Sequence, residues 1–381
     1  MTQGRKVWIV RAVIGLLLLI LVSSVSAQSY SLGGSSVGTV QKSAVVTVSV
    51  SSQQQSATEA FWTRDRMLSA QAMPLPVEKG LNQPAASEQT APAQPVQTVN
   101  SIASAPKMDQ LARQLYPSEW LRAAEAVPAS NQAALTNAPA DTLAVDPFTS
   151  GTARFDRYPV NYNTQMWQYH PFRAMGRLFF TNTYGQSSSC SAAVVANRGV
   201  LTAGHCVYTP GRGFHTHVSF VPAYRYGAAP YGTFTAFSLA TLGNWATNGA
   251  RADDVGMVAV SDRSGYRVNQ WVGNLGLAWN YSPIQLLNAF GYPANIGNTN
   301  YSSVCVGESW QEQAGGVIGM GCDMTYGSSG GPWVLNFIPY LSGGNYVNSV
   351  VSGGDPSIPK FYGPYFDTAN IGQLWTWVQN K

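Results

Sequence analysis

Two short segments decide how the rest of this sequence is interpreted: residues 201–206 read Leu-Thr-Ala-Gly-His-Cys, and residues 327–332 read Gly-Ser-Ser-Gly-Gly-Pro. The first places a histidine after an apolar run, and the second places a serine in a glycine-rich turn. Glycine allows a tight turn that aims backbone N–H groups at one point beside the hydroxyl. A hydroxyl, a base and such N–H groups are parts that nucleophilic acyl transfer needs.

A carboxylate that orients the base completes this set of groups. Asp254 directly precedes the apolar run 255–258, which favours it over its neighbour Asp253. Ser329 is favoured over Ser328 as the nucleophile because two glycines follow it. The sequence therefore predicts the chain order His205, Asp254, Ser329.

The serine turn also matches G-x-S-x-G, the nucleophile elbow of α/β-hydrolases, and that fold needs its histidine after the serine. All histidines of this chain precede Ser329: His170, His205, His215 and His217. The elbow interpretation therefore fails. A subtilisin order would need an acid before His205 and would leave Asp253 and Asp254 unused.

Composition favours a β-rich protein. Only 10% of the 381 residues are charged, against about 25% in an average soluble protein, while Gly (37), Tyr (19) and Trp (11) are abundant. Aromatic and β-branched residues suit strands, so a helical bundle is excluded and an all-β fold is expected. Short apolar runs between turn residues predict strands at 177–180, 192–195, 200–201, 218–221, 256–260, 285–289, 333–335 and 347–351. A net charge of +4 without a basic block argues against nucleic-acid binding.

The amino end predicts export. Arg5, Lys6 and Arg11 precede the apolar run 12–22, and Ala27 ends a small-x-small site, so residues 1–27 resemble a cleaved signal peptide. The apolar run is shorter than the roughly 20 residues a membrane span needs, so no membrane association is expected after cleavage.

Residues 28–154 form a low-complexity leader rich in Ser, Ala, Gln and Pro, which we expect to be largely disordered. Two islands stand out, at 61–67 and at the helix-like stretch 108–126. A propeptide is the favoured interpretation, and a permanent flexible stalk is the alternative.

Export makes disulfides possible among the four cysteines, Cys190, Cys206, Cys305 and Cys322. Three pairings are open, and the simplest joins them in sequence order. No C-x-x-C pair is present, which argues against zinc. His215 and His217 could share a strand face as metal ligands, but we expect a polar surface there. No metal and no cofactor are predicted.

The segments 190–195, 201–206, 254–258 and 327–332 together resemble those of secreted chymotrypsin-fold serine proteases, and within them the glutamyl-endopeptidase-like branch. Residues 61–67 are a weaker match to a segment upstream of the catalytic domain in that branch. The resemblance implies two six-stranded antiparallel barrels, expected at 155–265 and 266–381, with the active site between them. A short carboxyl-terminal helix capped by Thr368 or Asn370 is expected from the residues themselves.

The resemblance also implies residue roles. His205 is the general base and acid, Asp254 orients it, and Ser329 is the nucleophile. The N–H groups of Gly327 and Ser329 form the oxyanion hole. A Cys190–Cys206 disulfide would tether the histidine loop.

Two positions depart from the family pattern. Trypsin-type enzymes carry Asp before the nucleophile, and it pairs with the new amino terminus after activation. Ser328 cannot form that ion pair, so a propeptide that blocks the cleft or assists folding is expected instead. Glutamate-specific relatives carry a histidine where this chain has Val351, in a pocket that Ser352 and Gly353 would also line. Asp323, six residues before Ser329, would favour a cationic side chain if it were free in that pocket.

The sequence therefore predicts a secreted, monomeric serine endopeptidase that acts on proteins or peptides. The alternative is a catalytically inactive homologue that serves as an extracellular binding module, and an esterase on the same fold is a third possibility. The sequons at Asn280 and Asn300 are possible glycosylation sites.

Overall fold

The computed structural model describes residues 44–76, 95–102, 154–160, 166–313, 316–339, 344–355 and 358–381. The predicted signal peptide and the helix-like stretch 108–126 lie outside the described residues, so both stay predictions. Within the described segments, no helix is both long and apolar enough to cross a membrane.

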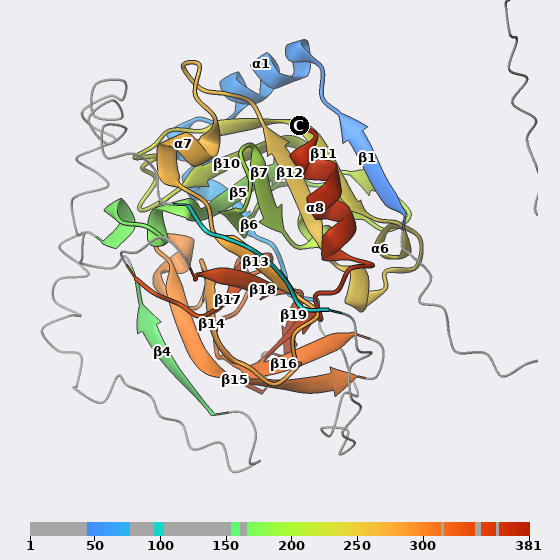
Figure 1. Cartoon of the computed structure of the whole chain (residues 1–381). Coiled ribbons are helices and arrows are strands. Elements are labelled where there is room, and N and C mark those ends of the chain that lie inside the picture. The colour runs from blue at the N-terminus through green and yellow to red at the C-terminus, as the bar shows by residue number, and fades with distance from the viewer. Residues whose placement is uncertain are drawn as a thin grey trace, which may run out of the picture. The chain divides into compact units, whose positions relative to one another are not determined.

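Residues 175–260 contain a closed barrel of six antiparallel strands (Figure 1). Around the ring the order is β11, β10, β5, β6, β7, β12 and back to β11. The strands are β5 (Met175–Thr181), β6 (Ser187–Val194), β7 (Gly199–Thr202), β10 (Thr216–Pro222), β11 (Phe234–Leu242) and β12 (Gly256–Val260). Side chains fill the interior of a barrel this small. The strands β7 and β12 are accordingly buried at every residue.

Strands from residues 276–364, together with β3 and β4 from earlier in the chain, form a ten-stranded sheet. Its order is β19-β20-β16-β15-β14-β17-β18-β13-β3, and β4 also pairs with β15. Its strands are β3 (Gln97–Val99), β4 (Phe155–Pro159), β13 (Gly276–Trp279), β14 (Leu286–Gly291), β15 (Ser303–Gln313), β16 (Val317–Gly321), β17 (Pro332–Leu335), β18 (Tyr346–Val350), β19 (Gly353–Asp355) and β20 (Lys360–Pro364). Among the described residues this sheet is an open path of pairs, and β13 pairs parallel with β18. It therefore differs from the expected second closed antiparallel barrel.

The all-β expectation is confirmed, and every run predicted as a strand overlaps a strand of the structure. The carboxyl-terminal helix is also confirmed as α8 (Ile371–Gln379). Asn370 caps it, because its side chain accepts a hydrogen bond from the backbone N–H of Ile371. Leu374 and Val378 bury the inner face of the helix in the core that includes the first barrel.

Both disulfides follow the simplest of the possible pairings. Cys190 is bonded to Cys206, with Cα atoms 6.1 Å apart, and Cys305 is bonded to Cys322, with Cα atoms 5.6 Å apart. The first links strand β6 to the turn that follows β7, and the second links β15 to the residue after β16.

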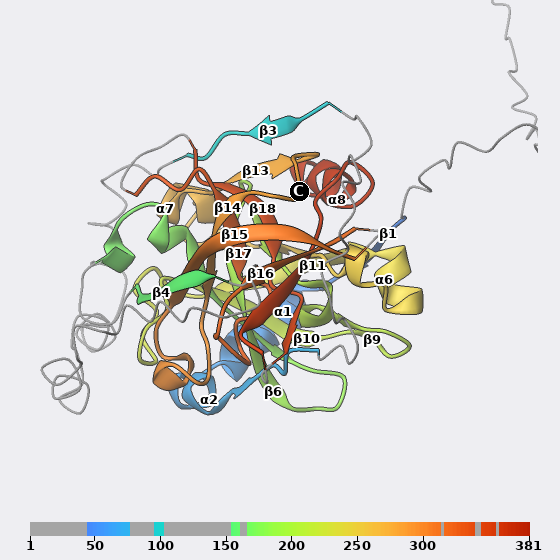
Figure 2. The same cartoon turned by 90° about the horizontal axis from the view of Figure 1, so that it is seen from below.

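The leader contributes more ordered structure than its composition indicated. Strand β1 (Val45–Ser49) pairs with β11, β2 (Gln71–Ala72) pairs with β6, and β3 pairs with β13, which Figure 2 shows alongside it. Two helices lie between the first two strands: α1 (Ser52–Phe61) and α2 (Arg64–Ser69). The valines of β1 explain its docking, since Val45 and Val48 pack against the main hydrophobic core.

The island at 61–67 is the anchor of this leader. Trp62 and Met67 are buried in a cluster with Phe179 and Tyr224 of the catalytic part of the chain. The indole N–H of Trp62 donates to the carbonyl oxygen of His217, 2.5 Å away. Burying two large side chains holds helix α2 against the first barrel.

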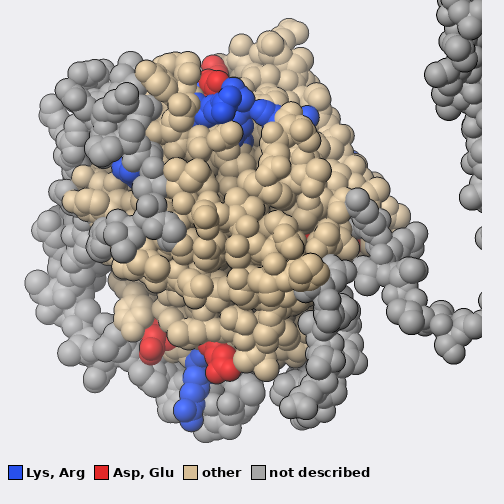
Figure 3. All heavy atoms as spheres, viewed as in Figure 1, with Lys and Arg blue, Asp and Glu red and all other residues tan. Residues whose placement is uncertain are grey.

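Charged side chains are sparse on the face drawn in Figure 3, as expected for a chain that is 10% charged. Most of the described surface there is formed by uncharged residues.

Adjacent residues of α2 test whether the leader is part of the folded unit. Met67 is 0% exposed and Leu68 is 41% exposed. In a Ser329→Ala background, which prevents self-digestion, Met67→Ala should lower the free energy of unfolding by about 2–5 kcal/mol, because it leaves a cavity. Leu68→Ala should cost about 1 kcal/mol or less. Urea unfolding measures both values, and equal effects would show that α2 is not docked.

Candidate active site

The candidate base lies on the turn that follows β7. His205 is the middle residue of a 3₁₀ turn, Gly204–Cys206, and the Cys190–Cys206 disulfide fixes the end of that turn to β6. The histidine is only 5% exposed. Its ring lies 6.2 Å, centroid to centroid, from that of Trp245, whose indole N–H donates to the carbonyl oxygen of Tyr208. Packing and the disulfide therefore limit how far this ring can move.

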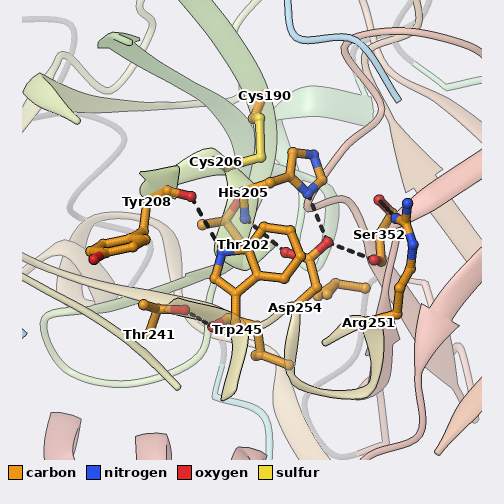
Figure 4. Close-up of polar contacts among 12 residues, drawn as sticks. Cys190, Thr202, His205, Cys206, Tyr208, Thr241, Trp245, Arg251, Asp254 and Ser352 are labelled. Atoms are coloured by element: carbon orange, nitrogen blue, oxygen red, sulfur yellow. Dashed lines mark hydrogen bonds and ion pairs between the residues drawn. A yellow bond between two sulfur atoms is a disulfide. The ribbon is translucent and has the colours of Figure 1, made fainter. Parts of the chain in front are cut away.

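Asp254 meets this histidine in the interior of the protein. Its carboxylate is 0% exposed and accepts hydrogen bonds from the backbone N–H of His205 at 2.7 Å and from the imidazole Nδ1 at 2.8 Å. A third donor, the hydroxyl of Ser352, lies 2.5 Å from Oδ2 (Figure 4). Three donors compensate a charge that has lost its water.

The same contacts determine the protonation state of the carboxylate. Burial alone would raise the pKa of Asp254, but the neighbouring His205, its hydrogen bonds and the Ser352 hydroxyl together hold that pKa below its usual value. Asp254 is therefore ionised at neutral pH and accepts a hydrogen bond from the Nδ1–H of His205. In an uncharged imidazole that donates from Nδ1, the Nε2 atom is the acceptor.

Ser352 brings the second sheet into the site. It follows β18, and Arg251, from the turn before Asp254, donates to its carbonyl oxygen at 3.3 Å. Sequence reasoning placed Ser352 in the specificity pocket and missed its bond to Asp254. The two residues are 98 positions apart, so only the folded chain reveals this contact.

The serine turn depends on two glycines. Gly327 has φ +88° and Gly330 has φ +77°, a backbone region that favours glycine. A Cβ at Gly330 would lie 2.0 Å from the hydroxyl oxygen of Thr202, so the turn also needs glycine to approach β7. The N–H of Ser191 donates to the Ser329 carbonyl oxygen at 2.7 Å, which ties the turn to β6. The turn is thus held against β6 and β7, the two strands that precede the His205 turn.

The reactive atoms of this arrangement are buried and unpaired. Neither Nε2 of His205 nor Oγ of Ser329 has a hydrogen-bond partner, and both residues are almost fully buried. Catalytic hydrogen bonds are often long before substrate binds, so an unmade bond between them does not exclude proton transfer.

The alternative residues occupy other surroundings. The carboxylate of Asp253 accepts from the side-chain amide of Asn244 at 2.9 Å, whereas Asp254 is the acid that contacts His205. Ser328 is fully buried, with its Oγ unpaired and close to Gly291 of β14.

Asp323 is not the free carboxylate that a cationic preference requires. The side chain of Arg157, in β4, donates to it at 3.0 Å and forms an ion pair with it. The two residues are 166 positions apart, which hid the pair from sequence analysis. Val351 is fully buried in the hydrophobic cluster that contains Ala289 and Phe361, and it offers no donor to an acidic substrate.

No metal-binding group of suitable chemistry is found among the described residues. Two clusters have the right separations, but each contains both sulfurs of a disulfide, Cys190–Cys206 or Cys305–Cys322, and these are not thiolates. His215 and His217 were considered as a metal pair. His215 instead bonds the Cys206 carbonyl oxygen and the Thr209 hydroxyl, and the ring of His217 stacks on Phe61.

Known structures resemble this chain over its catalytic part. The protease Anisep from Arthrobacter nicotinovorans is 34% identical, with a TM-score of 0.51, and the match covers 55% of this chain and 97% of that protease. The thermostable serine protease AL20 from an extremophilic microorganism is 32% identical with the same TM-score, over 55% of this chain and 99% of that protein. The chain belongs to the chymotrypsin-fold protease family that these two proteins represent.

The other comparisons are weaker. An extracellular metalloprotease of Bacillus subtilis (strain 168) is 26% identical over 163 residues, and the match spans 42% of this chain and 42% of that protein. No family model matches the chain.

His215 predicts how stability changes with pH. Burial lowers its pKa from 6.5 to about 4, so the folded protein holds it neutral. As the pH falls from about 6.5 to about 4, His215 becomes protonated in the unfolded chain but stays neutral in the folded protein. The free energy of unfolding therefore falls by about 3 kcal/mol in total. Urea unfolding of Ser329→Ala at about pH 7 and about pH 5 should show about 2 kcal/mol of this loss. His215→Gln should reduce it, and an unchanged pH slope in that variant would contradict the assignment.

Proposed function

We propose that this protein is a secreted serine endopeptidase that hydrolyses peptide bonds with Ser329 as nucleophile, His205 as general base and acid, and Asp254 as the orienting carboxylate. The observation that carries the proposal is the buried Asp254 carboxylate, which accepts hydrogen bonds from the backbone N–H and from Nδ1 of His205. The protein needs no cofactor for this reaction and acts as a monomer. Two disulfides and the signal-like amino end support the extracellular location.

The first half of the reaction forms an acyl-enzyme. His205 Nε2 removes the hydroxyl proton of Ser329 as Oγ bonds to the substrate carbonyl carbon, and the negative charge passes to the carbonyl oxygen. The N–H groups of Gly327 and Ser329 stabilise that oxygen. The C–N bond then breaks, and the amine leaves with the proton that His205 gives back.

Water completes the reaction. It attacks the acyl carbon while His205 takes its proton, and the proton returns to Oγ of Ser329 as the carboxylic acid leaves. Asp254 stays ionised throughout. Its position below the imidazole stabilises the imidazolium that forms in each half, and the Ser352 hydroxyl keeps the carboxylate in place.

The nucleophile can be tested by covalent labelling. A fluorophosphonate should label Ser329 once the leader is removed, and peptide mapping should find the adduct on the segment that contains residues 327–332. Ser329→Ala should abolish both label and peptide hydrolysis, while Ser328→Ala retains them. An unlabelled but folded protein would favour the inactive binding module instead.

The orienting carboxylate has its own test. Asp254→Asn preserves the shape of the side chain but presents an amide to Nδ1, which disfavours the productive tautomer. We expect kcat to fall by about 10⁴ with little change in KM. Asp253→Asn is the matched control and should change kcat less than about threefold. A similar loss in both variants would contradict the assignment.

A further inference from the structure

Part of the leader passes directly through the candidate site. Strand β2 pairs parallel with β6, opposite Ser188 and Ser189. The next residue, Met73, donates its N–H to the Ser189 carbonyl oxygen at 2.9 Å and accepts from the N–H of Gly327 at 3.0 Å. Gly327 N–H is one of the two donors proposed for the oxyanion hole. The Met73 carbonyl therefore occupies a donor that a reacting substrate needs.

Two residues further on, a side chain of the leader enters the apolar cluster of the second sheet. Leu75 is 4% exposed and belongs to the cluster that contains Val351 and Phe361. A Cβ built on Gly354 would lie 3.2 Å from Cδ1 of Leu75 and 3.3 Å from Cδ1 of Phe361. A side chain at position 354 would therefore crowd Leu75.

The backbone after Leu75 follows the wall of the expected specificity pocket. A Cβ on Gly353 would lie 2.8 Å from the carbonyl oxygen of Pro76. Gly353 and Val351 are two of the four residues that the sequence placed in that pocket, with Asp323 and Ser352. Residues 71–76 thus extend from β6, over Gly327, to Gly353 and Gly354 of β19.

The charges near this pocket are engaged elsewhere. Asp323 pairs with Arg157, and Lys360, in β20, pairs with the buried Glu312 at 2.9 Å. Arg251 lies beside Gly353 and donates to the Ser352 carbonyl oxygen. Glycine backbone and apolar side chains are what remains to contact a substrate side chain.

We infer that residues 71–76 are an intramolecular inhibitor, and that the pocket holding Leu75 accepts an apolar substrate side chain of about that size after the leader has left. This inference rests on the proposed protease function and names its substrate class. It accounts for the burial of Ser329 and His205 Nε2 while the leader is in place. It also replaces the cationic preference that a free Asp323 would have supported.

The inhibitory role is tested on the full chain with Leu75→Ala, and with Leu68→Ala as the control from the exposed face of the same leader. We expect the fluorophosphonate to label Ser329 at least about tenfold faster in Leu75→Ala than in the wild type, a change of about 1.4 kcal/mol. Leu68→Ala should label at the wild-type rate. Equal rates in all three proteins would overturn the inhibitor assignment.

Hydrogen exchange separates this inference from the proposed function. In a Ser329→Ala background, the Gly327 amide should exchange at least about tenfold faster when Leu75 is also replaced by Ala, because its acceptor on Met73 is loosened. The Gly327 amide could exchange faster while the proteins that keep Ser329 are never labelled. That result would contradict the protease function but would still support the docking of residues 71–76. Unchanged exchange would refute the docking itself.

The substrate class is measured with the Leu75→Ala enzyme and three peptides that differ only in the residue before the cleaved bond: leucine, glutamate or arginine. The peptide with leucine should have a kcat/KM at least about tenfold above the other two. A preference for arginine would restore a role for Asp323. A preference for glutamate would point to Arg251, and either result would overturn the apolar assignment.

Discussion

The burial of one carboxylate is the constraint on which the rest of this structure depends. Asp254 has no contact with solvent, and its three donors come from the turn after β7, from the His205 ring and from Ser352 after β18. A buried charge deprived of such partners costs several kcal/mol. The first barrel supplies two donors and the second sheet the third. The Asp254 carboxylate therefore keeps all three donors, and holds the His205 ring in place, only when the two sheets are correctly packed.

The leader has two structural roles: it pairs with strand edges of both sheets, and it crosses the candidate site. Strand β1 covers β11, and β3 covers β13, so backbone groups that would otherwise face solvent are paired. Between these strands the chain is anchored by Trp62 and Met67 and then crosses Gly327. Because the anchor and the crossing are only a few residues apart, docking of α2 holds residues 71–76 close to the site at high local concentration.

The sequence predicted the parts of this structure that local chemistry determines. Runs such as 256–260 are apolar and β-branched, so strands were predicted there. The glycines around Ser329 predicted the tight turn that the structure shows. Strand β11 was missed, because alanines and a serine interrupt the phenylalanines and threonines that favour a strand there. The Arg157–Asp323 pair and the bond from Ser352 to Asp254 were also missed, because contacts between residues far apart in sequence leave no local pattern.

The scarcity of charge limits how this site can recognise a substrate. Of the few acids in the described catalytic part, Asp254 orients the histidine, Asp262 pairs with Arg198, Asp323 with Arg157 and Glu312 with Lys360. Each of these is thus committed to a partner within the fold. Recognition by shape and by backbone hydrogen bonds remains, and residues 71–76 use both, with a leucine in an apolar cluster and a carbonyl on Gly327. Because residues 71–76 occupy the place of a substrate, we expect the substrate to bind through the same two contacts: an apolar side chain in that cluster and a carbonyl oxygen on the Gly327 N–H.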